Sequence, residues 1–276
     1  MIPPKLFNLC GDVSINTYGL FIVLGILTFL YFLHQHSRRP DLIDTDTLFN
    51  LTSIGIIAAV FGARLFFVIE HYDRFVSSPM STLFLWQGGY SVLGSLVVAP
   101  LVLMVYLWWK RIAVIQLVDL VMVHVPLLQA IARLGCFFAG CCYGIAASAS
   151  SWWSVTYTHP DSLAPLCVAL HPTQLYSAVL SFAIFVALKS LSRRLFVIHG
   201  MLFSLYFVLE GSARFAVDFL RGGRGNELEF SKMSIFEIIK YTTGYQMVAV
   251  MLVIGGIVGC CVSYCAYKQK QNGGDA

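Results

Sequence analysis

The sequence predicts an all-α integral membrane protein with about seven transmembrane helices, its amino terminus outside and its carboxyl terminus in the cytoplasm. Of 276 residues, 58% are hydrophobic and only 12% are charged. A water-soluble domain would have too little polar surface to cover such an apolar interior, so the bilayer is the expected solvent. We expect one polytopic membrane domain over residues 1–276, and no internal repeat is visible.

Seven stretches are apolar over nearly the length needed to cross the hydrocarbon layer, which takes roughly 20 residues. They cover residues 17–33, 48–69, 90–109, 112–131, 172–191, 196–218 and 245–267. The segment before Thr17 has one lysine, and no convincing cleavage site of small residues follows. We therefore expect the first stretch to be a helix of the mature protein and not a signal peptide.

Basic residues set the predicted orientation, because Lys and Arg near the ends of spans favour the cytoplasmic side. Every second connection is basic, through Arg38, Arg39, Lys110, Arg111, Lys189, Arg193, Arg194, Lys268 and Lys270. The sixth connection also holds Arg221, Arg224 and Lys232, here beside acidic residues. This distribution explains the net charge of +4 and predicts no nucleic-acid partner.

In this orientation the ionisable residues gather near the outer side of the membrane. At mid-membrane such a side chain costs at least about 2.5 kcal/mol on insertion scales, so these residues should cluster where they serve a site. They are Arg64, Glu70 and His71 on the second stretch and Glu210, Arg214, Asp218 and Arg221 on the sixth, the latter spaced to share one helical face.

Arg64, Arg133 and Arg214 predict a pocket for an anionic phospholipid headgroup. A guanidinium binds phosphate through paired hydrogen bonds and keeps its charge. We expect the three arginines to meet in one pocket of the outer leaflet. The simpler alternative is that arginines near helix ends reach to the interface and pair with acids, as suits Arg74, Arg221 and Arg224 equally well.

The stretch RLGCFFAGCCYG, residues 133–144, holds three cysteines within seven residues. Beside Arg133 they favour a reactive thiolate or a redox pair, and an oxidising outer side would permit a disulfide. Packing is the alternative, as for the apolar Cys10, Cys260, Cys261 and Cys265. A zinc site is disfavoured because C-x4-C-C lacks the usual C-x2-C spacing and needs Cys167, His159 or His171 as fourth ligand. We expect no metal and no cofactor.

These motifs resemble those of the bacterial prolipoprotein diacylglyceryl transferase family. The family signature G-R-x-G-N-F-x-N-x-E-x-x-G is similar to the cysteine-rich stretch, and four further family motifs resemble segments elsewhere. The matching positions are Arg133, Gly135, Phe137 and Gly144 in the signature, with Ala132 in register, then YGLF at Tyr18, GARL at Gly62, HPTQLY at His171 and ARFAVDFLRG, where Asp218 replaces a glutamate.

The resemblance implies a multi-pass enzyme of the bacterial inner membrane whose active site faces the outer leaflet. It implies transfer of diacylglyceryl from phosphatidylglycerol to the thiol of a lipobox cysteine in a prolipoprotein, with release of glycerol phosphate. The sequence departs from the family at Cys136, Ala139 and Cys141, which replace two asparagines and a glutamate, and at Leu93, where a histidine is usual. A thiol-disulfide protein using Cys136, Cys141 and Cys142, or a non-catalytic lipid-binding member, are therefore alternatives.

We assign expected roles to these positions. The catalytic candidates are Asp218, Cys136, Cys141, Tyr18 and His171, and the substrate-binding candidates are Arg133, Arg214, Arg64, Gly135, Gly144 and Tyr176. A buried carboxylate, Asp218 or Glu70, could take the proton of a thiol with a pKa of about 8.5, with His171 next. Helix capping by His171 and an aromatic-belt position for Tyr18 and Tyr176 are the structural alternatives.

Overall fold

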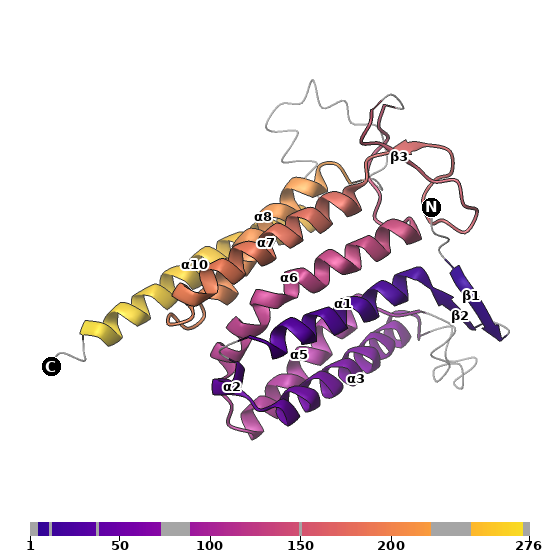
Figure 1. Ribbon diagram of the computed structural model, residues 1–276. Helices are drawn as coiled ribbons and strands as arrows, with labels where there is room; N and C mark the ends of the chain where they lie inside the picture. Colours follow the sequence, from indigo (N-terminus) through magenta and orange to yellow (C-terminus); the bar gives the residue numbers. More distant parts are fainter. Residues whose placement is uncertain are drawn as a thin grey trace. The chain divides into compact units, whose positions relative to one another are not determined.

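The computed structural model consists of long helices and two small sheets in the residues that it describes (Figure 1). These residues are 5–10, 13–36, 39–72, 89–148, 151–221 and 244–272. Arg38, Arg74, Arg224 and Lys232, which the sequence places in connections, lie outside them. The short strands were not expected from the sequence, and they lie between the apolar stretches or before the first of them.

Each of the seven apolar stretches corresponds to one long helix. The helices are α1 (Thr17–His34), α3 (Thr45–Glu70), α5 (Val92–Trp109), α6 (Val114–Ala139), α7 (Thr173–Leu195), α8 (Met201–Asp218) and α10 (Gly244–Asn272), with the short α2 (Arg39–Leu42) after α1. Among the described helices, α1, α3, α6, α7 and α10 are long and apolar enough to cross a membrane, and α5 is a shorter apolar helix. Helix α8 is as long as α1 but carries Glu210, Arg214 and Asp218.

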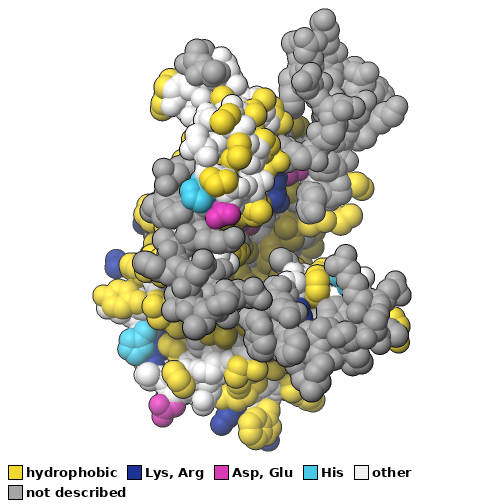
Figure 2. Space-filling model, turned by 90° about the vertical axis from the view of Figure 1, so that its right-hand side faces the viewer, with side chains coloured by type: hydrophobic (Ala, Val, Ile, Leu, Met, Phe, Trp, Pro, Cys, Tyr) yellow, Lys and Arg dark blue, Asp and Glu magenta, His cyan; other side chains and the backbone are white. Residues whose placement is uncertain are grey.

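The surface of the helices is apolar, as expected for a multi-pass membrane protein. Large hydrophobic side chains such as Leu27, Phe49, Met104 and Val262 are exposed on α1, α3, α5 and α10. In Figure 2, hydrophobic side chains are visible over much of the described surface, together with several Lys, Arg, Asp, Glu and His side chains. Such side chains are stable against lipid tails, whereas their exposure to water would be unfavourable.

The described contacts divide the chain into two units. The first comprises residues 1–7, 15–33 and 118–276, and the second comprises residues 8–14 and 34–117. A single domain over residues 1–276 therefore stays a prediction. Strands β1 (Lys5–Cys10) and β2 (Val13–Asn16) pair in a two-stranded sheet before α1.

In the first unit, α8 packs against α7 and α10, and α1 packs against α6 (Figure 1). Glycines allow the close approach of these helices: a Cβ on Gly256 would lie 2.7 Å from Ser204 O, and one on Gly135 would lie 2.9 Å from the Cβ of Phe21. In the second unit, α3 packs against α5, and a Cβ on Gly62 would lie 2.6 Å from Gly94 O. Small residues serve this purpose at helix interfaces in membranes.

Helix α6 is longer than predicted. The apolar stretch was expected to end at residue 131, but the helix continues to Ala139, so Arg133, Gly135 and Cys136 lie within it. Its continuation is possible because Gly135, which disfavours helix on its own, is packed against α1. The helix ends where Gly140 adopts a φ of 73°.

The connection between α6 and α7 folds into a small cap. Strands β3 (Val155–Thr156) and β4 (Ala169–Leu170) pair antiparallel, with Val155 opposite Leu170. Tyr157, Ala164 and Leu170 form its buried core. Isolated bridges join Ala146 to Leu170 and Gly144 to Arg221, so the cap also contacts the segment that follows α8.

Candidate functional site

The turn that ends α6 brings two cysteines together. The Gly140 N–H donates to Phe137 O at 3.3 Å, and the Cys141 N–H donates to Cys136 O at 3.2 Å. These two bonds, with Gly140 in the left-handed conformation, form a Schellman motif. That motif folds the residue after the glycine back onto the residue five positions earlier, here Cys141 onto Cys136.

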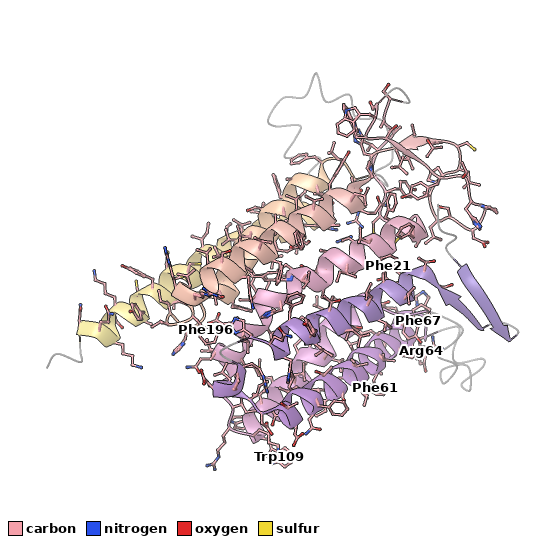
Figure 3. All side chains as sticks on the ribbon, in the orientation of Figure 1. Phe21, Phe61, Arg64, Phe67, Trp109 and Phe196 are labelled. Atoms are coloured by element: carbon pink, nitrogen blue, oxygen red, sulfur yellow. The ribbon has the colours of Figure 1, made fainter. Side chains whose placement is uncertain are left out.

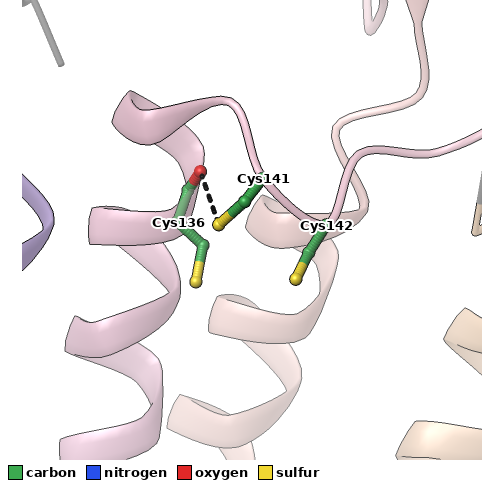
Figure 4. Close-up of side chains that lie close together, drawn as sticks. All are labelled: Cys136, Cys141 and Cys142. Carbon is green, nitrogen blue, oxygen red and sulfur yellow. Dashed lines mark hydrogen bonds between the residues drawn. The ribbon is translucent and has the colours of Figure 1, made fainter. Parts of the chain in front are cut away.

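Cys142 completes a cluster of three thiols. The Sγ atoms of Cys136, Cys141 and Cys142 all lie within 4.8 Å of one another (Figure 4). Cys136 is buried, and the Cys141 thiol donates to Cys136 O over 3.7 Å. Cys142 has a φ of 58°, which is uncommon for a residue with a side chain. The helix cap therefore brings the three sulfurs of this C-x4-C-C sequence together, although the C-x2-C spacing that is usual in zinc sites is absent.

The first residues of α7 hold this turn by its backbone. The Thr173 hydroxyl donates to Cys142 O at 2.8 Å, and the Gln174 amide donates to Cys141 O at 2.7 Å. Both side chains are almost completely buried, with 1% exposed. The sequence did not suggest Thr173 or Gln174 as site residues, although both lie in the HPTQLY motif at His171.

Tyr157 of the cap supports the same turn. Its hydroxyl donates to Phe137 O at 3.2 Å and accepts from the Gln174 amide at 3.2 Å. Burial raises the pKa of Tyr157 to about 12, so its hydroxyl keeps its proton and its donor role at physiological pH. This contact joins the cap to the end of α6.

Arg221 contacts the thiol cluster directly. Its Nη2 atom lies 3.1 Å from the Cys142 Sγ. Hydrogen bonds from the thiols of Cys136 and Cys141 hold the pKa of Cys142 well below its usual value, and the charges of Arg221 and Arg133 add to this effect. Hydrogen bonding to the other two thiols and burial raise the pKa of Cys141. The Arg221 guanidinium therefore favours the thiolate form of Cys142.

Two of the three predicted phosphate-binding arginines line one small cavity. Arg133 on α6 and Arg214 on α8 line it together with Glu210 and with two serines, Ser177 and Ser181, on α7. The Oε2 atom of Glu210 is buried and has no hydrogen-bond partner among the described residues. Arg133 lies one helical turn before Cys136, so the cavity and the thiols are neighbours along α6.

Arg64 belongs to the second unit. It is 7% exposed, its Nη1 atom donates to Gly89 O at 3.0 Å, and its guanidinium lies 5.7 Å from the centre of the Phe67 ring. Figure 3 shows Arg64 and Phe67 near the same end of α3. Glu70, the last residue of α3, accepts a hydrogen bond from the Ser91 hydroxyl at 2.9 Å. That Arg64 joins Arg133 and Arg214 in one pocket stays a prediction.

Tyr18 and Asp218 lie beside these groups in the first unit. Tyr18 is the second residue of α1, its backbone lies beside Gly135 of α6, and its hydroxyl interacts electrostatically with the three thiols and Arg133. Asp218 is the last residue of α8, is 3% exposed and interacts electrostatically with Arg214. Their catalytic roles stay predictions.

His171 and Gly144 lie where three segments meet. The His171 Nδ1 atom lies 3.3 Å from the Tyr176 hydroxyl, and its carbonyl accepts from the Gly144 N–H at 2.9 Å. A Cβ on Gly144 would lie 2.5 Å from Leu220 O and 2.7 Å from His171 O. Chain packing thus explains the glycine, and a substrate contact of Gly144, His171 or Tyr176 stays a prediction.

Comparison with known proteins identifies the chain. The family model described as prolipoprotein diacylglyceryl transferase matches residues 4–262. A phosphatidylglycerol–prolipoprotein diacylglyceryl transferase of Clostridium tetani is 34% identical over 86% of this chain and 94% of its own length. Similar enzymes are 28% identical in Clostridium perfringens, over 89% of this chain and 90% of the relative, and 27% identical in Streptococcus mutans, over 94% of both chains. The chain therefore belongs to the prolipoprotein diacylglyceryl transferase family.

Proposed function

We propose that the protein transfers the diacylglyceryl group of phosphatidylglycerol to the thiol of a lipobox cysteine in a prolipoprotein. The names of its relatives support this donor and this acceptor. The observation that carries the proposal is the cavity in which Arg133 and Arg214 lie together. Two fixed positive charges against the single carboxyl group of Glu210 leave a net positive charge, which suits the phosphate of an anionic lipid.

The reaction is a substitution at the glyceryl carbon. The acceptor sulfur forms a bond to this carbon while the carbon–oxygen bond to phosphate breaks, and the electron pair leaves with glycerol phosphate. Arg133 and Arg214 stabilise the negative charge that develops on the leaving group, and the hydroxyl of Ser181 can donate to it, whereas that of Ser177 donates to Thr173 O at 2.9 Å. Asp218, and next His171, are the proposed acceptors of the thiol proton, and Tyr18 is proposed to hold the glyceryl oxygens.

We further propose seven spans, with the site facing the outer leaflet of the bacterial inner membrane. The basic residues after α5 and at the ends of α7 and α10 support this orientation, since they belong on the cytoplasmic side. The cap and the cysteine turn follow the opposite end of α6. Arg64 is proposed to approach the headgroup from the second unit.

Transfer to a peptide tests the proposal. Purified protein is incubated with labelled phosphatidylglycerol and a lipobox peptide, and the peptide thiol is analysed by mass spectrometry. The wild type should add one diacylglyceryl group, and Arg133→Ala should slow this by about 10²- to 10³-fold. Arg194→Ala, which removes an exposed charge from the last turn of α7, is the matched control. A peptide that stays unmodified with the wild type contradicts the proposal.

A further inference from the structure

The three thiols form a more complete arrangement than helix capping needs. A Schellman motif is often accompanied by an apolar contact between its two ends, and Cys136 with Cys141 would supply that contact. Cys142 is not part of it, yet its sulfur also points into the cluster (Figure 4). It does so from a left-handed backbone conformation, with a φ of 58°.

The sulfur positions suit a metal ion. Three thiolates around a tetrahedral zinc ion, with bonds of about 2.3 Å, are about 3.8 Å apart. The Sγ atoms already lie within 4.8 Å of one another, so small side-chain rotations would bring all three into range. Thiolates select soft or borderline ions such as Zn²⁺ over Mg²⁺ or Ca²⁺.

The surroundings hold the sulfurs in place. Thr173 and Gln174 bind the carbonyls of Cys142 and Cys141, so the backbone of the turn is fixed from the side of α7. Such contacts, which fix the residues that carry metal ligands, are typical of metal sites. The Tyr157 hydroxyl of the cap also donates to Phe137 O, near the end of α6.

The charges also fit. Three thiolates and one divalent ion carry a formal charge of −1, and the Arg221 guanidinium contacts the Cys142 sulfur at 3.1 Å. A single guanidinium would neutralise this site before the acceptor thiolate binds. Arg133, one turn before Cys136, adds a second positive charge nearby.

The protein supplies three donors to the site. Among the described residues, the group of metal-binding atoms comprises the three cysteines alone. The other candidate ligands have different surroundings: Cys167 is exposed, His159 accepts from the Asp161 N–H at 3.2 Å, and His171 contacts Tyr176. Three protein ligands with a fourth from outside is the arrangement of catalytic zinc, whereas structural zinc has four protein ligands.

We infer that Cys136, Cys141 and Cys142 bind one zinc-class ion as three thiolates, and that its fourth ligand is the thiol of the acceptor. The second part rests on the proposed function. A thiol that binds such an ion loses its proton, which passes to Asp218, the proton acceptor proposed above. The bound sulfur then attacks the glyceryl carbon, the electron pair of the carbon–oxygen bond leaves with phosphate, and the ion keeps its oxidation state. The neighbouring cavity with Arg133 and Arg214 would hold that phosphate.

Metal analysis tests the site without reference to activity. The full-length protein in detergent is equilibrated with zinc, freed of loose metal on a desalting column and analysed for bound zinc. The wild type and Cys261→Ser, which changes an exposed cysteine of α10, should each retain about one ion per chain. Single serine substitutions of Cys136, Cys141 and Cys142 should weaken zinc binding by at least roughly tenfold to a hundredfold. Co²⁺ in place of zinc should give sulfur-to-metal charge-transfer bands in the wild type and the control only.

Two results would overturn the site: zinc retention that is equal in all the variants, or a disulfide between two of the three cysteines in protein that binds no zinc. The acceptor step has a separate test. Chelator-treated protein should modify the lipobox peptide at least roughly tenfold more slowly, and zinc should restore the rate. Equal rates with and without metal would refute the acceptor step but leave the transferase proposal standing. Tight zinc binding by a protein that modifies no peptide would keep the site and refute the proposed function.

Discussion

Thr173 and Gln174 act on the site through the backbone of the cysteine turn. Each donates to the carbonyl of a cysteine, and neither side chain contacts solvent to any extent. A buried carbonyl that loses its donor keeps the full cost of having left water. The HPTQLY motif of this family is therefore explained, at two of its positions, by support of the neighbouring turn.

Gln174→Leu tests this support. The substitution leaves Cys141 O without its donor and removes the contact to the Tyr157 hydroxyl, so we expect the free energy of unfolding to fall by about 1–3 kcal/mol. Thermal unfolding in detergent measures it. Ser190→Ala removes an exposed hydroxyl that bonds within α7, and it should change stability by less than about 0.5 kcal/mol. Equal effects of the two substitutions would argue against a supporting role.

Helix α6 positions both halves of the candidate site. Its last turns hold Arg133 at the cavity and Cys136 in the thiol cluster. The turn at Gly140 then brings Cys141 back beside Cys136. The end of this helix could not be predicted from the run of apolar residues alone, because Arg133 and Gly135 interrupt that run. Packing of Gly135 against α1, which depends on the tertiary structure, makes the longer helix favourable.

The Gly140→Ala substitution tests the helix cap. Gly140 has a φ of 73°, and a Cβ there would also collide with the Ser162 hydroxyl, so we expect a loss of at least about 1 kcal/mol and weaker zinc binding. The control is Gly255→Ala on α10, where a Cβ would have no neighbour within 4 Å. Helix propensity predicts an unchanged or slightly higher stability for this variant. If Gly140→Ala is as stable as Gly255→Ala, the cap does not control this turn.

Helix α6 also caps the start of α8. The Asp119 carboxylate, fully buried on α6, accepts from Gly200 N at 2.6 Å and Phe203 N at 2.8 Å. Free N–H groups at a helix start need such acceptors. We expect Asp119→Ala to lower the free energy of unfolding by about 1–2 kcal/mol, measured by thermal unfolding. Asp46→Ala, at an exposed position in the first turn of α3, is the control. If Asp119→Ala changes stability as little as this control, the capping role is contradicted.

Across the chain, apolar length predicted the positions of all seven long helices, since the membrane requirement is a property of local sequence. The convergence of Arg133 with Arg214 was also predictable, because the predicted topology places their helix ends on one side of the membrane. The thiol cluster was not, because its geometry depends on a cap and on the start of α7. Glu210 was visible in the sequence on one face with Arg214, yet its place in the cavity needed the structure.

The orientation of the whole chain has a direct test. Alkaline phosphatase, which is active only outside the cytoplasm, is fused in one protein within the cap near residue 163 and in another after Lys270. We expect activity from the first fusion and none from the second, because Lys and Arg favour the cytoplasmic side. The reverse result would place the candidate site on the cytoplasmic side.

The central claim is that Arg133 and Arg214 bind one phosphate group of the lipid donor. Transfer to the lipobox peptide can be measured as kcat/KM for Arg133→Ala, Arg214→Ala and the double variant. Because both side chains line one cavity, each single substitution should lower kcat/KM by about 10²- to 10³-fold, and the double variant should lose much less than the product of the two. Losses that multiply independently, or single variants as active as Arg194→Ala, would contradict the claim.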